Sequence, residues 1–131
     1  MTFPNQLLIG GRWQDSLHNK QTFDSIDPST GKLLTKVASA GKYDVEAAVK
    51  ASKEAFATWN AIPRFDRGQI ISKFGDNLMA HKDEIVALEC NDHGKPVFQA
   101  SMDLDFSVKI IKHYAGKCDK ITGTSFQREA G

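Results

Sequence analysis

The feature that most constrains this chain is a series of amphipathic helical patterns that no strand pattern interrupts. Apolar residues recur at three- and four-residue steps from Asp44 onward, and Asp44 itself is predicted to be the first N-cap. The predicted helices cover 45–59, about 66–80, a short stretch after Asp83, and about 97–120, where Gly123 ends the last one. Because strands do not alternate with these helices, no complete parallel sheet is expected, and the helices can cover one another's apolar faces only in part.

Before these helices the pattern has the period of strands. Short apolar-containing runs flank Gly10-Gly11, two glycines that suit the positive φ angles of a tight hairpin turn. Further strands are predicted over 22–26 and 33–38, with a turn at DPSTGK, residues 27–32. The predicted fold class is therefore α+β, with an N-terminal β-hairpin and short strands followed by about four helices.

Length and composition exclude several classes of protein. A chain of 131 residues fits one domain, and its formal net charge of +1 provides no field to hold nucleic acid. Its apolar runs are far shorter than the ~20 residues of a membrane span, so no membrane partner is expected. Two cysteines are too few for a disulfide framework, and the opening MTFPNQLLIGG lacks a basic targeting pattern. We therefore expect a cytoplasmic protein.

Two pairs of potential metal ligands occur late in the chain. Cys90 and His93 stand three residues apart, and His113 and Cys118 stand five apart, which superficially resembles a Cys₂His₂ zinc site. A spacing of five places the second pair on diverging faces of one continuous helix. Ordinary structural roles for all four residues are therefore favoured over zinc.

The other candidate residues lie in or near the last predicted helix. The pair Gly94-Lys95 lacks the earlier glycine of a phosphate-binding loop, so that function is excluded. Asp103 and Asp105 point to different sides of a helix, which argues against shared acid–base work, although Asp105 is near enough to the apolar stripe to pair with a basic residue of another element. Met102 and Phe106 share one face, as core residues or as the wall of a ligand channel.

Four blocks of sequence occur in a characteristic order. They are LLIGGRWQDS at 7–16, DPSTGKLLTKVASA at 27–40, DVEAAVKASKEAFATWNAIP at 44–63 with RGQIISKFGDNLMAHKDEIVALE at 67–89, and ECNDHGKP at 89–96 with HYAGKCDKITG at 113–123. In this order they resemble the N-terminal part of the NAD(P)-dependent aldehyde dehydrogenase superfamily, with Lys117 at a position where an aromatic residue is usual. The resemblance implies that the fold is an incomplete part of the α/β, Rossmann-like fold of that superfamily.

The resemblance also implies how the chain is organised and what it does. Residues 1–131 would form a single N-terminal segment, with hairpin and strands at 1–43, a helical part at 44–122, and the start of an oligomerisation strand at 123–131 that is truncated at Gly131. Complete family members oxidise aldehydes to carboxylates with NAD or NADP. Their cysteine nucleophile, glutamate base and cofactor-binding residues lie beyond this segment. The segment alone is therefore expected to be inactive and to bind neither cofactor tightly.

A few site residues carry over by position. Ile26, through its carbonyl, and Asp92 match the ligands of a monovalent cation, and Met102 and Phe106 match positions that border the substrate tunnel. No catalytic or cofactor-binding residue of the family falls on this chain. The implied partner is a full-length aldehyde dehydrogenase subunit or a second copy of the chain. An interaction or regulatory module that docks through its uncovered helix faces is the alternative hypothesis to an inactive enzyme segment.

Overall fold

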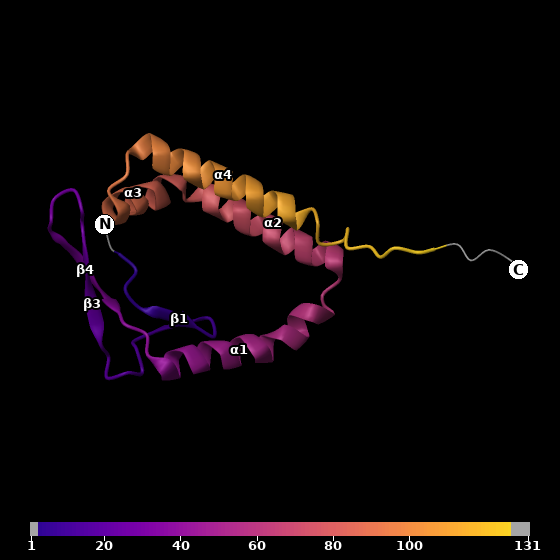
Figure 1. Cartoon of the computed structure of the whole chain (residues 1–131), viewed down its shortest axis with the longest axis horizontal. Coiled ribbons are helices and arrows are strands. Elements are labelled where there is room, and N and C mark those ends of the chain that lie inside the picture. Colours follow the sequence, from indigo (N-terminus) through magenta and orange to yellow (C-terminus); the bar gives the residue numbers. More distant parts are fainter. Residues whose placement is uncertain (1–2, 127–131) are drawn as a thin grey trace, which may run out of the picture.

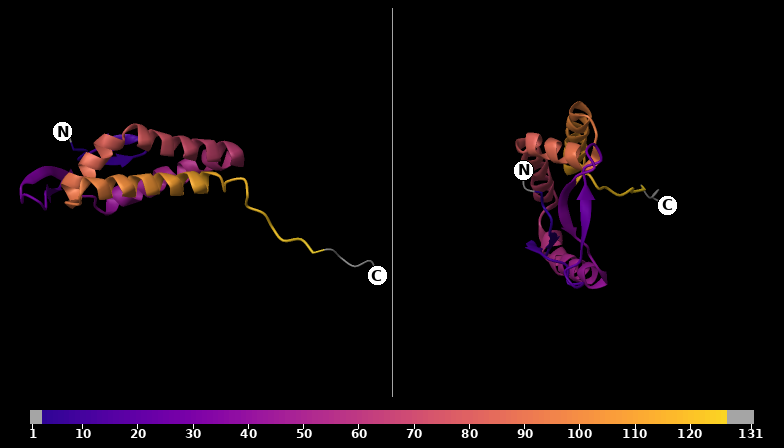
Figure 2. Two further views of the ribbon diagram at one scale, coloured as in Figure 1. Left: turned by 90° about the horizontal axis from the view of Figure 1, so that it is seen from above. Right: turned by 90° about the vertical axis from the view of Figure 1, so that its left-hand side faces the viewer.

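The computed structural model describes residues 3–126, which contain two small antiparallel sheets and four helices (Figure 1). The elements in chain order are β1 (Leu7–Ile9), β2 (Arg12–Gln14), β3 (Thr22–Ile26), β4 (Leu33–Ala38), α1 (Lys42–Ala61), α2 (Arg64–Ala80), α3 (Lys82–His93) and α4 (Val97–Ala115). Helix α1 and strand β1 run along one side of the molecule, helices α2, α3 and α4 run along the other, and the β3–β4 hairpin lies at one end (Figures 1 and 2). The predicted α+β class is confirmed.

The opening hairpin forms because its turn can adopt left-handed backbone angles. Gly10 and Gly11 have φ values of +58° and +76°, and strands β1 and β2 pair on either side of them from Leu7 opposite Gln14 to Ile9 opposite Arg12. Positive φ at both central residues is the requirement of the primed turns that match strand twist. The predicted hairpin is confirmed, as are the strands at 22–26 and 33–38.

Helix α1 begins earlier than its sequence pattern predicts. Gly41 is the N-cap, so Asp44 is not the cap but the third helical residue, where its carboxylate accepts the backbone N–H of Gly41 at 2.8 Å. The same carboxylate accepts the Ser16 hydroxyl at 2.8 Å and the Leu17 N–H at 2.8 Å, and Asp44 is only 1% exposed. A reaching-back carboxylate at this position satisfies a free helix donor as a cap would. Asp44 therefore ties the loop after β2 to the start of α1.

The core lies where α2, α3 and α4 meet. Small residues, Gly68 and Gly75 on α2 and Ala100 and Ala115 on α4, are buried at these contacts. A Cβ atom placed on Gly68 would lie 2.6 Å from the Ala115 carbonyl oxygen, so the two helix backbones approach closely at that point. Small residues permit this distance, and larger ones would hold the helices apart.

The buried stripe of α4 is not the one that its large apolar residues predict. The stripe that packs inside the chain consists of small and medium residues, namely Ala100, Leu104, Val108, Ile111 and Ala115. Met102 and Phe106, the residues predicted to share one face, are exposed together with the large apolar residues Phe98, Ile110 and Tyr114. The helix therefore has two apolar faces, and the bulkier face is uncovered within these residues.

The C-terminal end of α4 also differs from the prediction. The helix ends at Ala115 with Gly116 as its C-cap, not near residue 120, because tighter bonds such as Lys117 N–H to the Tyr114 carbonyl replace the helical pattern. Residues 120–126 belong to neither helix nor strand, so the described part of the strand expected over 123–131 is not formed. A strand needs a neighbour for its backbone groups, and the described residues supply none here. Residues 127–131 lie outside the described part.

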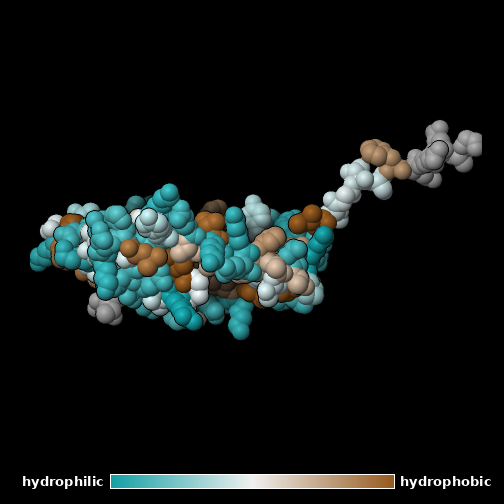
Figure 3. Space-filling model, turned by 90° about the horizontal axis from the view of Figure 1, so that it is seen from below, coloured by the Kyte–Doolittle hydropathy of each residue, from teal (hydrophilic) through white to brown (hydrophobic). Residues whose placement is uncertain are grey.

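Helix α1 packs differently from the other helices. It touches β1 and the turn that follows, where a Cβ on Gly10 would lie 3.7 Å from the Ala51 Cβ, and Asp44 is its one buried residue. Val45, Val49 and Phe56 are each about half exposed or more, and apolar side chains interrupt the polar surface seen from this side (Figure 3). Across residues 3–126, we find no helix with the length and apolar character that a membrane crossing requires.

Candidate functional site

The end of β3 and the end of α3 meet at one corner of the molecule. The Ser25 hydroxyl donates a hydrogen bond to Asp92 Oδ1 at 2.8 Å, although the two residues lie 67 positions apart. Gly94, the left-handed C-cap of α3, packs closely on the turn that follows β3. A Cβ on Gly94 would lie 2.7 Å from Pro28 Cγ in that turn. The structure thus brings the segments of Ile26 and Asp92, the predicted cation ligands, to the same corner.

The turn after Ile26 is held rigidly by Asp27. Its carboxylate accepts the Thr30 hydroxyl at 2.8 Å and the Ser29 N–H at 2.7 Å, and these bonds, the Thr30 bond first, lower the pKa of Asp27. Its carbonyl accepts the Gly31 N–H at 2.8 Å. The position of the Ile26 carbonyl is therefore set by a preorganised turn and by the adjacent β3–β4 pairing.

The donor set at this corner suits a hard cation but supplies only part of a coordination shell. Carbonyl and carboxylate oxygens, as at Ile26 and Asp92, are the ligands that such cations prefer. Within residues 3–126, no three His, Cys, Asp or Glu side chains gather in a way that could hold a metal ion. Ile26 and Asp92 carry oxygen donors of the predicted kind, and the cation site stays a prediction.

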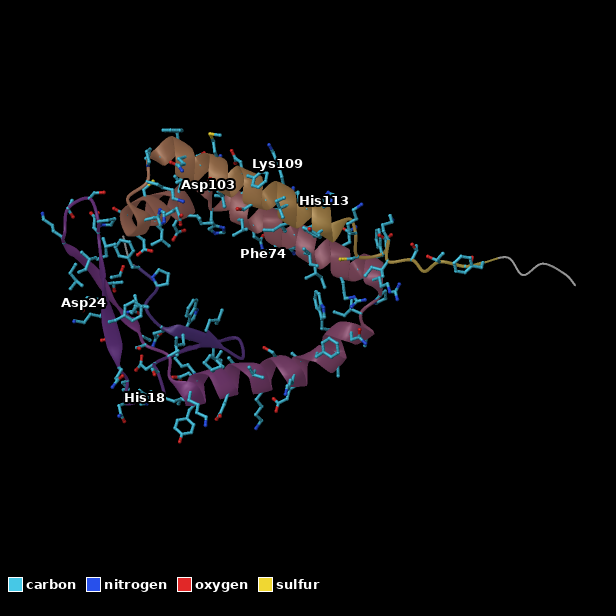
Figure 4. All side chains as sticks on the ribbon, in the orientation of Figure 1. His18, Asp24, Phe74, Asp103, Lys109 and His113 are labelled. Carbon is cyan, nitrogen blue, oxygen red and sulfur yellow. The ribbon has the colours of Figure 1, made fainter. Side chains whose placement is uncertain are left out.

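The predicted tunnel residues lie together on the outer face of α4. Met102 and Phe106 are each 65% exposed, one helical turn apart, so they point away from the stripe that packs on α2 and α3. Lys109 and His113 follow on the same helix, and Lys109 lies on the side that points away from α1 (Figure 4). This face offers apolar contact to a molecule or segment outside the described residues.

Charged side chains link α3 to α4. Lys95 Nζ lies 2.7 Å from Glu89 Oε1 and 3.0 Å from Asp103 Oδ2, and its side chain is 15% exposed. These two carboxylates, Glu89 first, raise the pKa of Lys95. Lys82 Nζ lies 2.7 Å from Asp105 Oδ1, which confirms that Asp105 pairs with a basic residue of another element.

The cysteine and histidine pairs do not assemble. Cys90 and His93 belong to the end of α3, whereas His113 belongs to α4 and packs edge-on against Tyr114 with ring centroids 5.4 Å apart. Cys118 lies in the turn beyond α4, with its Sγ 3.6 Å from the Tyr114 carbonyl oxygen. These contacts are structural.

Sequence reasoning missed three polar residues of these sites. Ser25 had no signal beyond its place next to Ile26 at the end of a predicted strand. Lys82 and Lys95 resembled ordinary surface lysines, and only Asp105, close to the apolar side of its helix, indicated that a basic partner was needed.

Comparison with known proteins identifies the family of the chain. A family model described as the Aldehyde dehydrogenase family matches residues 13–131. Mitochondrial aldehyde dehydrogenase of Equus caballus is 38% identical over 125 residues, which cover 92% of this chain and 25% of that protein. The benzaldehyde dehydrogenase of Antirrhinum majus mitochondria is 37% identical over 122 residues, which cover 91% of this chain and 23% of that protein.

Solved structures share the fold. The crystal structure of PnpE in complex with nicotinamide adenine dinucleotide has a TM-score of 0.92 and 32% identity, covering 98% of this chain and 26% of that one. An NADP dependent enzyme of E. coli has a TM-score of 0.92 and 26% identity, with the same coverage of 98% and 26%. The chain thus spans about a quarter of the length of the proteins it matches, so its architecture is a fragment of their fold, as predicted. By sequence and by structure, the chain belongs to the aldehyde dehydrogenase family.

Proposed function

We propose that these residues form the N-terminal scaffold of an aldehyde dehydrogenase that uses NAD or NADP to oxidise aldehydes to carboxylates. Within it, α4 would form part of the wall of the substrate tunnel, and the β3–α3 corner would supply part of a cation site. The thiolate attack, the hydride transfer to the cofactor and the hydrolysis of the thioester would be carried out by residues outside this stretch.

The observation that carries this proposal is the pair of opposite faces on α4. One face packs on α2 and α3 within the chain, while Met102 and Phe106 on the other face are 65% exposed. A soluble helix normally keeps its bulky apolar side chains covered. An apolar outer face on a family member that spans a quarter of its relatives supports a role as wall and scaffold for further protein.

Enzyme assays on the purified chain test the absence of independent activity. Incubation with NAD or NADP and a panel of aliphatic and aromatic aldehydes is expected to give no reduced cofactor, and calorimetric titration is expected to show no micromolar binding. A Cys90→Ser/Cys118→Ser variant is the matched control for thiol chemistry. Turnover that this variant abolishes would refute the scaffold proposal.

The cation role of Ile26 and Asp92 needs a separate test. In a complete dehydrogenase that carries these residues, Asp92→Ala is expected to weaken the dependence of stability on sodium or potassium, because one carboxylate ligand is lost. Ser25→Ala keeps that carboxylate and is the matched control. Equal salt responses in the parent and in Asp92→Ala would exclude Asp92 as a ligand.

The exposed apolar faces favour one second candidate. We propose as an alternative that the chain docks onto a full-length aldehyde dehydrogenase subunit or onto a second copy of itself. Light scattering after size-exclusion chromatography, alone and with a full-length relative, is expected to show a complex if this holds. A lone monomer in both samples would exclude docking.

A cytoplasmic location is also proposed, and imaging of the tagged protein in cells tests it.

A further inference from the structure

The sequence Asp103-Leu104-Asp105 places two carboxylates on opposite flanks of α4. Leu104 faces α3, where it lines a small cavity together with Ile85 and Val86. Because successive residues of a helix are rotated by about 100°, Asp103 and Asp105 project to the two sides of the line from α4 to α3. The two carboxylates therefore stand at the two edges of the buried stripe.

Each carboxylate is bound by a lysine from a different end of α3. Lys82, the first residue of α3, binds Asp105 at 2.7 Å, with side chains 29% and 40% exposed. Lys95, just beyond the end of α3, binds Asp103 at 3.0 Å and also Glu89 at 2.7 Å. The two lysines, one at each end of α3, thus bind the two flanks of α4.

The contact of α4 with α3 is less closely packed than its contact with α2. The cavity between the two helices has a volume of ≈ 160 Å³, and Glu89, Ala100 and Asp103 also contribute to its lining. Because this groove is partly open to solvent, fewer side-chain contacts oppose a small rotation of α4 on this side than on the side that packs on α2. Met102 and Phe106 lie two residues from Leu104, roughly 160° around the helix, so a rotation of α4 moves them sideways in proportion to the rotation angle and to their distance from the helix axis.

We propose that Lys82 and Lys95 are positioning residues that fix the rotation of α4 and thereby direct Met102 and Phe106 at the aldehyde. The inference rests on the proposed tunnel role of α4. The lysines act through the ion pairs with Asp105 and Asp103, and they touch neither substrate nor cofactor. Loss of one ion pair releases one flank only, so α4 turns toward the flank that is still held.

Spin-label distances in the 131-residue chain test the clamp directly. Labels are attached at Phe106→Cys on α4 and Lys73→Cys on α2, in a Cys90→Ser/Cys118→Ser background. Lys82→Met and Lys95→Met are expected to shift the mean label distance in opposite senses. Unchanged distances, or shifts in the same sense, would overturn the proposal, because general destabilisation has no preferred direction of rotation.

Two controls keep this result interpretable if a single variant is poorly folded. Lys82→Asp combined with Asp105→Lys restores the pair with reversed charges and is expected to return the distance to the parent value. Lys109→Met removes a lysine of α4 that makes no ion pair among residues 3–126, and it is expected to change nothing. Failure of the charge reversal to restore the distance would count against the clamp.

Aldehyde selectivity in a complete dehydrogenase that carries these residues tests the consequence. Lys82→Met is expected to change the ratio of KM values for a branched and a linear aldehyde by roughly tenfold while kcat stays constant, as misplaced pocket walls do. A distance shift without a change in this ratio would overturn the positioning role. The proposed tunnel itself fails only if Met102→Ala and Phe106→Ala also leave the ratio unchanged, so the two failures are distinguishable.

Discussion

The α2–α4 pair and helix α1 are both amphipathic, yet they use their apolar residues in opposite ways. Where α2 meets α4, glycines and an alanine bring the backbones together, and Gly68, Gly75, Val108 and Ala115 are buried. Helix α1 is longer, at 20 residues, but its one buried residue is the charged Asp44. The α2–α4 contact is complete within residues 3–126, whereas α1 is held mainly at its N-terminal end.

This difference shows that amphipathicity alone does not predict where a helix is buried. Large apolar residues mark a face that some surface must cover, and in α1 and α4 that surface is not provided by residues 3–126. Small residues at helical spacing mark close contacts between helices more reliably here, because only they allow backbone approach. The following predictions test this contrast between a closed contact and an open face.

The largest effect is expected from Gly68→Ala. The new Cβ would lie 2.6 Å from the Ala115 carbonyl oxygen, so one backbone must move. We expect the free energy of unfolding to fall by about 2 kcal/mol, in the range of other overpacked cores. Chemical denaturation followed by circular dichroism measures this loss. A stability equal to that of the parent would show that α2 and α4 do not pack this closely.

Gly75 is the second buried glycine of α2, and Gly75→Ala is expected to raise the free energy of unfolding, opposite to Gly68→Ala. Its Cβ would make ordinary contacts at 3.5 Å with Ile111 and Val108, so no backbone has to move. Replacing a helical glycine by alanine then stabilises the chain by up to about 1 kcal/mol through helix propensity. The same denaturation experiment measures the gain, and a loss as large as that of Gly68→Ala would contradict the geometry.

The stability of the chain is expected to depend on pH through Asp44 at the N-terminal end of α1. Hydrogen bonds from the Gly41 and then the Leu17 N–H lower the pKa of Asp44, with the Ser16 hydroxyl adding to them. The folded state therefore favours the carboxylate, and this stabilisation is complete above the unfolded pKa of about 4 and is lost as pH falls below it. Thermal melts against pH are expected to show this decline.

Substitutions separate Asp44 from other carboxylates in that experiment. Asp44→Asn is expected to lower stability at neutral pH and to flatten the acid decline, because the titrating group is gone. Ser16→Ala removes one of three donors and is expected to give a smaller change of the same kind. An acid decline in Asp44→Asn as steep as in the parent would assign the effect elsewhere.

The smallest effect is expected on the open face of α1. Phe56 is 62% exposed, so Phe56→Gln is expected to change the free energy of unfolding of this chain by less than about 0.5 kcal/mol. Val108→Ala, a truncation in the buried stripe of α4, is the matched comparison at about 2 kcal/mol. A large loss from Phe56→Gln would mean that α1 is covered within the chain after all.

The helices and strands could be predicted from the sequence, but which face of each helix is buried could not. The Gly10-Gly11 pair, periodicity and the DPSTGK turn located every strand of residues 3–126 and the approximate extent of most helices. The limits of α1 and α4 differ from the prediction because Gly41 caps α1 while Asp44 binds back from the third helical position, and because Gly116 ends α4 although its apolar pattern continues in the sequence. The face of α4 was misjudged because side-chain size, and not apolarity, decides the contact with α2.

The candidate site could be predicted only through family resemblance. Nothing in local spacing connects Ile26 with Asp92, since the chain reverses direction several times between them. The hydrogen bond of Ser25 and the ion pairs of Lys82 and Lys95 depend on tertiary placement in the same way. Charge pattern indicated one of these contacts, that of Asp105, because an acidic residue near a buried stripe requires a partner.

The contact between Ser25 and Asp92 also orders events during synthesis on the ribosome. The two hairpins and the start of α1 depend on residues up to Asp44, so they can form while the remainder is still being translated. The β3 end cannot find its counterpart until 67 further residues have emerged. For that interval the nascent hairpin is exposed to chaperones and proteases, and its final position is set only when α3 has emerged.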